Sequence, residues 1–275
     1  MRPSRARVLL GHAVLIGLGL LFLAPFVFMV STSLKSQEKV FTQTIQWIPR
    51  PIVFKNYPDA LSHFPFWRYL GNTLVLCGFT VIGSVVSAAI PDYGFARLRF
   101  KGRDTLFIVL LATLMLPAQV TQLPTFLLFR ALGWTGTLLP LIVPAYFGSP
   151  FSIFLLRQFF LTVPQELSDA ARIDGCSEWG IFTLILLPLS RPALATVALF
   201  AFIGAWTDFQ GPLIYLHDDR QYTLALALNG FLGRHGGEWN LLMAAATVVT
   251  LPMIAAFVLA QRTFIQGIAA TGLKG

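Results

Sequence analysis

Charged residues are scarce in this chain. Asp, Glu, Lys and Arg together make up 12% of the 275 residues, whereas apolar residues make up 56%. A soluble domain normally carries about 25% charged residues to cover its surface. Much of the surface therefore does not face water, which excludes an ordinary soluble globular domain. The mean hydropathy of +0.71 agrees with this interpretation.

Several motifs for bond-making chemistry are absent as well. The sequence contains no G-x-x-x-x-G-K-[ST] phosphate-binding loop, which excludes an ATPase of the P-loop kind. It contains no G-x-S-x-G nucleophile motif, since the nearest candidate, residues 175–179, lacks the second glycine. The four histidines, His12, His63, His217 and His235, show no metal-ligand spacing such as H-E-x-x-H. We therefore expect no catalytic residue, no metal site and no cofactor in this chain.

Basic residues outnumber acidic ones by 20 to 12, which gives a net charge of +8. They do not form a dense stripe with interleaved aromatic residues, as binding to nucleic acid would require. They lie in short patches between apolar runs, where the charges that orient membrane proteins lie. The sequence thus predicts contact with a lipid membrane and none with nucleic acid.

Long apolar stretches predict membrane-spanning helices, each of which needs about 20 apolar residues. Five stretches are free of charged residues, and a sixth has only Arg191 near one end, where the side chain can reach the membrane surface. The first stretch is too long for the apolar core of a signal peptide. The six predicted spans are 8–34, 69–91, 105–129, 131–156, 188–207 and 239–261. The predicted fold class is an all-α membrane protein.

The distribution of Lys and Arg predicts the orientation. The side that holds the N-terminus and the loop 97–103 has more basic residues, in shorter loops, than the other side. By the positive-inside rule, both termini are cytoplasmic. On the outer side, the stretch 221–233 is too short to span and is predicted to be a surface or re-entrant helix. The predicted division is a cytoplasmic N-terminus (1–7), a transmembrane domain (8–263) with a cytoplasmic loop (161–188), and a cytoplasmic tail (264–275).

The loop between the fourth and fifth spans has the most distinctive pattern. Thr162 and Gln165 have the spacing of a capping box, with Pro164 in the first turn. We therefore expect a helix over 163–173. Gly175 follows at a place where a left-handed residue commonly ends a helix.

A second short helix is expected over 178–187, with Ser177 as its cap and Pro188 at its end. Small and acidic residues surround the glycine and form the predicted contact surface for another protein: Glu166, Asp169, Ala170, Ala171, Asp174 and Gly175. The alternative is an amphipathic helix lying on lipid. Such helices favour Lys and Arg toward anionic headgroups, so the acidic character favours a protein partner.

This loop resembles the cytoplasmic signature loop in permease subunits of binding-protein-dependent ABC importers. The signature is Glu-Ala-Ala, three residues, Gly, and later Leu-Pro. The matching residues are Asp169, Ala170, Ala171, Gly175, Leu187 and Pro188. Two departures are the shorter carboxylate of Asp169 in place of Glu, and Cys176 where the family usually has Ala. They leave open how strong the contact with the ATPase is.

Further segments are similar to the carbohydrate-importing, maltose-type branch of this family, and the resemblance covers nearly the whole chain. These segments are 93–97 (YGFAR), 100–103 (FKGR), 116–117 (LP), 206–209 (WTDF) and the tail from 265 onward.

The resemblance implies the fold of type I ABC importer permeases, with six transmembrane helices, in the inner (plasma) membrane of a bacterium. It implies that the loop is a coupling helix which docks to a cytoplasmic ATPase subunit. The implied partners are a dimer of ATPase subunits that binds ATP and Mg, a second and different permease, and an external solute-binding protein. The tail 264–275 is a second candidate contact with the ATPase, and a disordered end is its alternative.

The resemblance implies a carbohydrate substrate, and four polar or aromatic residues of the spans are candidates for its pathway: Gln119, Gln122, Tyr146 and Trp206. Alternatively, the polar groups bond backbone carbonyls freed at proline breaks. Since the span interiors offer no Lys or Arg to pair with a phosphate, a neutral mono- or oligosaccharide is favoured over a polyol phosphate. A carrier coupled to protons or sodium would need ionisable groups inside the spans, whereas Asp92 and Asp208 lie at span ends.

Overall fold

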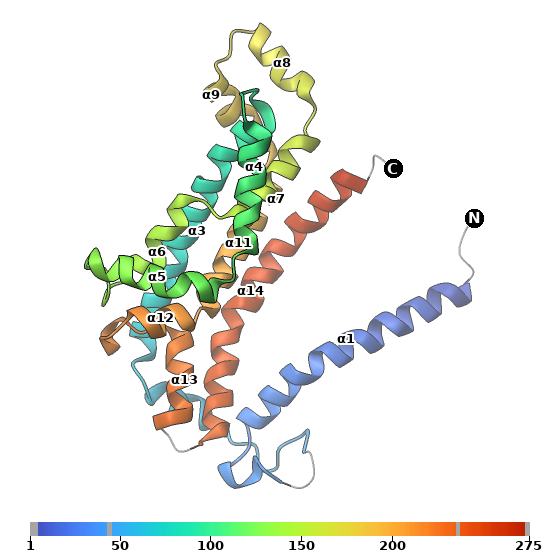
Figure 1. Ribbon diagram of the computed structural model, residues 1–275. Helices are drawn as coiled ribbons and strands as arrows, with labels where there is room; N and C mark the ends of the chain where they lie inside the picture. Colours follow the sequence, from blue (N-terminus) through green and yellow to red (C-terminus); the bar gives the residue numbers. More distant parts are fainter. Residues whose placement is uncertain (1–4, 43–45, 235–236, 273–275) are drawn as a thin grey trace. The chain divides into compact units, whose positions relative to one another are not determined.

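The computed structural model describes residues 5–42, 46–234 and 237–272, with side chains for 7–42, 46–231 and 237–261. These residues contain helices and no β-strand (Figure 1). The chain divides into two compact units. Unit 1 consists of Met1–Phe66 and Ala227–Pro252, and unit 2 of Trp67–Leu226 and Met253–Gly275.

Unit 1 contains α1 (Arg5–Ser33), α2 (Asn56–Ser62), most of α13 (Leu224–Arg234) and the start of α14 (Trp239–Gly272). Ala60, Phe231 and Ala244 belong to one apolar cluster that joins α2, α13 and α14. The side-chain amide of Asn56 donates to the carbonyl oxygens of Ser33 and Lys35, which holds α2 against the end of α1. The apolar residues of α1 itself are exposed, so α1 needs lipid or another chain to cover it.

Unit 2 contains the helices that position the loop between the fourth and fifth spans. They are α3 (Phe66–Arg97), α4 (Arg103–Ala112), α5 (Ala118–Ala131), α6 (Leu139–Ile142), α7 (Pro150–Thr162), α8 (Gln165–Ile173), α9 (Glu178–Gly180), α10 (Leu187–Leu189), α11 (Arg191–Thr207) and α12 (Gln210–Tyr215). Shorter helical turns are η2 (Thr113–Met115), η3 (Val143–Phe147) and the π-helical η4 (Ile181–Leu186). Two more, η1 (Gln37–Lys39) and η5 (Asp219–Gln221), lie in loops of unit 1 and unit 2 respectively. The core of unit 2 joins α3, α7, η4 and α11 through Ala88, Leu156, Phe160, Ile181 and Val197.

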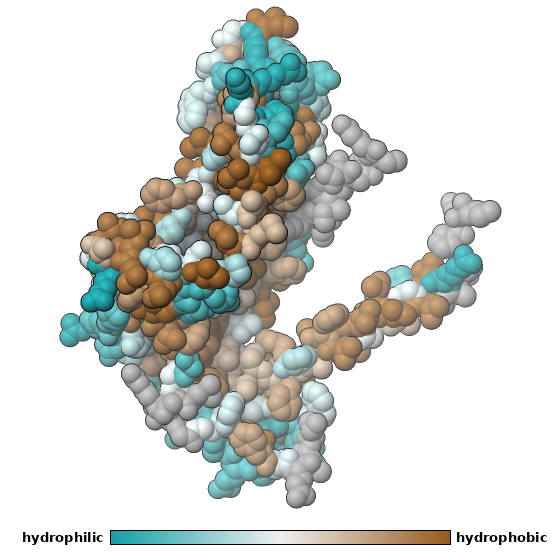
Figure 2. Space-filling model, viewed as in Figure 1, coloured by the Kyte–Doolittle hydropathy of each residue, from teal (hydrophilic) through white to brown (hydrophobic). Residues whose placement is uncertain are grey.

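Among the described residues, four helical stretches are long and apolar enough to cross a membrane: Arg7–Ser33, Phe66–Arg97, Leu139–Thr162 and Trp239–Gln261. Two bent pairs also qualify: Arg103–Met115 with Ala118–Ala131, bent by 97°, and Glu178–Leu189 with Arg191–Thr207, bent by 76°. If each pair is one span, the described residues hold six, in agreement with the six predicted. Figure 2 shows apolar residues along these helices and hydrophilic residues over α8 and α9.

Prolines and glycines change the details of the predicted spans. The third span breaks at Leu116 and Pro117, because proline lacks an N–H and forces the preceding residue into the extended conformation seen at Leu116. The fourth span starts at Leu139 and not at 131, after turns at Gly133 and Gly136 with φ of 70° and 80°. The fifth helix starts at Arg191, with Pro192 in its first turn.

The short helix predicted over 221–233 is present as α13, Leu224–Arg234. The predicted last span ends at 261, whereas α14 continues as a helix to Gly272. The backbone of most of the tail 264–275 is therefore helical, and residues 273–275 lie outside the described part of the chain.

Candidate functional site

The loop that follows α7 is a helix–glycine–helix, as predicted. After α8, Gly175 adopts a φ of 81°, the left-handed conformation that glycine reaches without strain. The N–H of Cys176 donates to the Ala171 carbonyl (2.9 Å), and the N–H of Gly175 donates to the Arg172 carbonyl (3.1 Å). These two bonds form the Schellman motif that ends a helix. A Cβ on Gly175 would meet no atom of this chain within 4 Å, so its backbone conformation, and not space within the chain, requires the glycine.

The predicted capping box at the start of α8 is wrong. Helix α7 continues through Thr162, whose hydroxyl donates to the Phe159 carbonyl (2.7 Å). Pro164 takes the cap position without a side-chain bond. The predicted second cap is confirmed, because the Ser177 hydroxyl accepts the N–H of Gly180 (3.1 Å). The second helix is α-helical only to Gly180 and continues as the π-helical η4.

Five of the six predicted contact residues are exposed on this loop: Glu166, Asp169, Ala170, Asp174 and Gly175. The sixth, Ala171, faces inward and belongs to the core of unit 2. Large apolar side chains that were not predicted as contact residues are also exposed on this loop, above all Ile173 (87% exposed) and Trp179 (63% exposed). The available signal was a large apolar residue within four positions of Gly175, in an otherwise polar stretch.

Ion pairs hold the end of α8. The Arg172 guanidinium donates to Asp169 (2.7 Å) and to Glu178 (2.7 Å). The hydrogen bond from Arg172 to Glu178 raises the pKa of Arg172 above its ordinary value, so the guanidinium stays charged. The other carboxylate oxygen of Glu178 accepts the hydroxyl of Tyr93 on α3.

Arg97, near the end of α3, holds the start of α8. Its guanidinium donates to the side-chain carbonyl of Gln165 (2.6 Å) and to the backbone carbonyls of Phe160 (2.7 Å) and Val163 (2.6 Å). The last carbonyls of a helix lack partners within the helix and carry partial negative charge, so a buried cation stabilises the end of α7. Arg97 thereby joins α3, α7 and α8.

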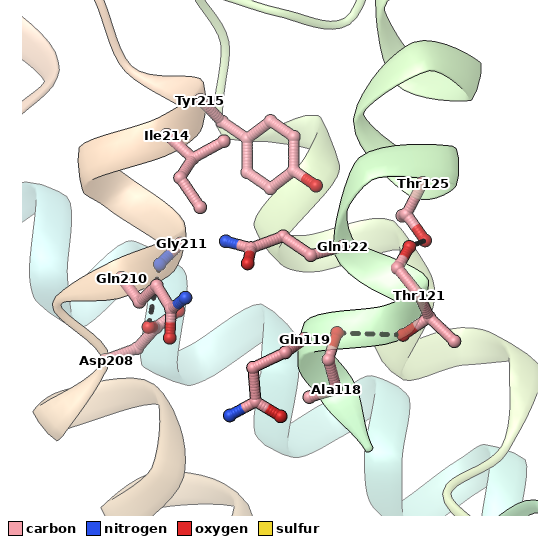
Figure 3. A pocket seen from close by; sticks show the side chains of 10 residues that line it. All are labelled: Ala118, Gln119, Thr121, Gln122, Thr125, Asp208, Gln210, Gly211, Ile214 and Tyr215. Atoms are coloured by element: carbon pink, nitrogen blue, oxygen red, sulfur yellow. Dashed lines mark hydrogen bonds between the residues drawn. The ribbon is translucent and has the colours of Figure 1, made fainter. Parts of the chain in front are cut away.

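A polar cavity of about 270 Å³ lies between α5 and α12 in unit 2. Figure 3 shows the side chains that line it: Ala118, Gln119, Thr121, Gln122, Thr125, Asp208, Gln210, Gly211, Ile214 and Tyr215. Its lining offers amides, hydroxyls, one aromatic ring and one carboxylate, and no Lys or Arg. Such a lining suits a hydroxylated, uncharged solute.

The structure places two of the four predicted pathway residues in this cavity. Gln119 and Gln122 project from α5 (Figure 3), and their amides have no hydrogen-bond partner among the described residues. The Tyr146 ring lies instead against Gly83, where a Cβ would come within 2.7 Å of it. Trp206 is buried against Phe202, with ring centroids 5.4 Å apart.

Other polar groups of the cavity already have partners. The hydroxyl of Thr121 donates to the Ala118 carbonyl (3.1 Å), and that of Thr125 to the Thr121 carbonyl (2.7 Å). These are not the carbonyls of Thr113 and Val120, which lose an N–H donor at Pro117 and Pro124, so the alternative of bonds to freed carbonyls stays a prediction. Asp208 accepts the N–H of Gly211 (2.9 Å) at the start of α12. Within the described residues, no group of three His, Cys, Asp or Glu side chains could hold a metal ion.

Relatives of known sequence agree with this architecture. The arabinooligosaccharides transport system permease protein AraQ of Bacillus subtilis (strain 168) is 33% identical over 265 residues, which cover 94% of this chain and 92% of AraQ. The diacetylchitobiose uptake system permease protein DasC of Streptomyces coelicolor is 31% identical over 264 residues, which cover 96% of this chain and 95% of DasC.

Solved structures show the same fold. A bacterial ABC transporter involved in the import of the acidic polysaccharide alginate contains a chain with a TM-score of 0.81 and 24% identity. The similarity covers 96% of this chain and 99% of that one. A complex of the alginate transporter with an alginate pentasaccharide-bound periplasmic protein gives a TM-score of 0.69 at 16% identity, over 93% of each chain. The predicted type I importer permease fold is thus confirmed.

The family described as binding-protein-dependent transport system inner membrane component matches residues 80–270, which include the helix–glycine–helix loop and the polar cavity. With several apolar helices beside this match, the chain is a multi-pass membrane protein. The chain belongs to the family of inner membrane components of binding-protein-dependent transport systems, as the resemblance of its loop predicted.

Proposed function

We propose that this chain is the permease subunit of an ATP-driven carbohydrate importer, in which it forms half of the translocation pathway. Coupling to a partner ATPase would run through the α8 loop, over 163–187. The observation that carries the proposal is the exposed helix–glycine–helix at the end of unit 2, held by ion pairs within the chain. The ATPase dimer would bind ATP and Mg and hydrolyse ATP, while this chain would be non-catalytic.

The composition of the loop surface supports docking to a protein. Ile173 and Trp179 expose large apolar side chains beside the small Ala170 and the flat backbone at Gly175. Apolar groups gathered on a loop favour a covering partner, and small residues let that partner approach closely. The carboxylates of Glu166, Asp169 and Asp174 would lie around this contact and set its register.

The orientation and the other partners belong to the same proposal. The α8 loop, the loop 97–103 and both termini would lie in the cytoplasm of a bacterium, on the inner side of the plasma membrane. A second, different permease would complete the pathway, and an external binding protein would deliver the solute. The alginate transporter was solved with such a periplasmic protein, and its chain shares the fold of this one.

We propose a neutral mono- or oligosaccharide as the solute. Gln119 and Gln122 offer amides that have no partner in the described part of the chain, Tyr215 offers a ring, and the cavity lining contains no cation that would pair with a phosphate. AraQ and DasC are named for the transport of arabinooligosaccharides and diacetylchitobiose, which supports a carbohydrate. Tyr146 and Trp206 lie outside this cavity, and we expect them to matter only if the pathway opens toward them.

Reconstitution tests the proposal. The chain is expressed with the neighbouring permease and ATPase genes, purified through a tag on this chain and placed in vesicles with the binding protein. We expect the ATPase to co-purify, and neutral sugars to be taken up only with ATP. Stable ATP hydrolysis by this chain alone would contradict the proposal, and so would uptake of glycerol phosphates without any response to neutral sugars.

A further inference from the structure

Both ends of α8 are attached to the same turn of α3. Arg97 binds Gln165, the first residue of α8. Tyr93 binds Glu178, which in turn binds Arg172 in the last turn of α8. Two side chains of α3 therefore reach the two ends of the exposed helix, Arg97 directly and Tyr93 through Glu178.

The spacing of the two attachments determines whether α8 and α3 move together. Tyr93 and Arg97 are four residues apart, so they lie on one face of α3, separated by about 6 Å along its axis. One contact would let α8 pivot against α3 without moving it. Two contacts fix the direction of α8 relative to α3, so a displacement of α8 also displaces α3.

The two side chains that leave α3 are buried. Arg97 is 8% exposed and Tyr93 is 7% exposed, so packing restricts the rotation of both side chains. The three bonds of Arg97 are between 2.6 and 2.7 Å long and involve a charged donor, which makes them stronger than neutral hydrogen bonds. Two of them go to the end of α7, so α7 would move with α3 and α8. The outer face of α8 meanwhile stays exposed for a partner.

We propose that Tyr93 and Arg97 are positioning residues that transmit movement of the α8 loop to α3 and α7. The proposal rests on the proposed function, because the movement would come from the docked ATPase. A purely structural role would need these contacts only for folding. If the contacts transmit movement, the solute uptake per ATP hydrolysed also depends on these contacts.

The test compares complexes reconstituted in vesicles, with uptake and ATP hydrolysis measured on the same preparation. In Arg97→Gln and Tyr93→Phe, we expect the assembled complex to hydrolyse ATP at nearly the normal rate. Uptake per ATP should fall by about tenfold, since each change removes at least one charge-assisted hydrogen bond that is buried or partly buried. Arg97→Lys, which keeps the charge and some donors, should recover part of the loss.

Two further variants sharpen the comparison. Arg99→Gln removes an exposed arginine two residues beyond Arg97 and should leave uptake per ATP unchanged. Glu178→Ala should lower uptake per ATP, and adding Tyr93→Phe to it should lower it no further, since both remove the same bond.

Normal uptake per ATP in both Arg97→Gln and Tyr93→Phe would overturn the proposal. Loss of uptake and ATP hydrolysis in equal proportion, or loss of the assembled complex with no recovery in Arg97→Lys, would also overturn it in favour of a structural role. If the unaltered chain binds no ATPase at all, the proposed function itself fails, and co-purification shows this before any variant is measured.

Discussion

At the scale of single residues, Gly175 and Asp169 belong to the same sequence motif but contribute differently to the α8 loop. Gly175 holds a left-handed conformation that ends α8 and keeps the loop surface flat. Asp169 offers one exposed carboxylate, which already pairs with Arg172 inside the chain. No neighbouring residue can supply the backbone conformation of Gly175 in its place. An exposed ion pair, in contrast, contributes little to stability on its own.

Gly175→Val should therefore abolish transport. A β-branched residue at this φ costs about 1 kcal/mol or more, and its side chain would also enter the surface where the partner docks. Asparagine tolerates the left-handed region better, so Gly175→Asn should retain more uptake. Uptake in cells and the amount of chain in the membrane fraction check this. Normal uptake by Gly175→Val with normal insertion would show that the loop does not have the coupling role.

Asp169→Ala should have a smaller effect than Gly175→Val. The side chain of Asp169 is 57% exposed, and an exposed ion pair is worth under about 1 kcal/mol. Uptake should fall by about fivefold or less, measured at equal expression. A complete loss of uptake in Asp169→Ala, with the chain still in the membrane, would mean that this carboxylate contacts the ATPase directly.

At the scale of helices, the sequence predicted where the spans lie in the chain better than how the spans bend. Five runs without charge, and a sixth with only Arg191, located the helices that can span a membrane, because the bilayer imposes a length that the sequence must meet. The 97° bend at Pro117 was not predicted, since proline permits a kink whose size depends on packing. The capping box failed because α7 extends to Thr162, and Arg97 of α3, far along the sequence, binds the carbonyls at this helix end.

The candidate sites, too, were predicted best where the signal is local in the sequence. The α8 loop was predictable because a glycine, a cap and charged residues are local signals. The cavity was predictable only in part, since Gln119 and Gln122 belong to α5, whereas Tyr215 and Gln210 come from α12, far along the sequence. The apolar Ile173 and Trp179 were missed because a large apolar residue in a membrane chain is first interpreted as buried in lipid.

The cavity between α5 and α12 leads to a prediction about affinity. Gln122→Leu removes an amide without another partner among the described residues and should raise the half-saturation concentration for a neutral sugar by about tenfold. Leu123→Ala, at the next and exposed position of α5, is the matched control and should change it little. Equal half-saturation in Gln122→Leu, Gln119→Leu and the unaltered chain would place the solute contacts elsewhere.

At the scale of the whole molecule, the six predicted spans and the distribution of basic residues predict the orientation. Single cysteines at Arg99 and Asp219, in a chain lacking Cys77 and Cys176, test it. An impermeant thiol reagent added to intact cells should label the cysteine at 219 and spare the one at 99. Labelling of both positions from outside would show that the arrangement of six spans with cytoplasmic termini is wrong.

Docking of the α8 loop to an ATPase is the central claim, and Ile173 is its most exposed apolar side chain. A photoreactive amino acid at Ile173 tests the claim most directly, with the same residue placed at Phe41, an exposed apolar position in the predicted outer loop, as the control. After irradiation of the whole complex in membranes, we predict that the adduct from position 173 contains the ATPase subunit and that the adduct from position 41 does not. Crosslinks from position 173 to lipid alone, with the ATPase present in the complex, would contradict the claim.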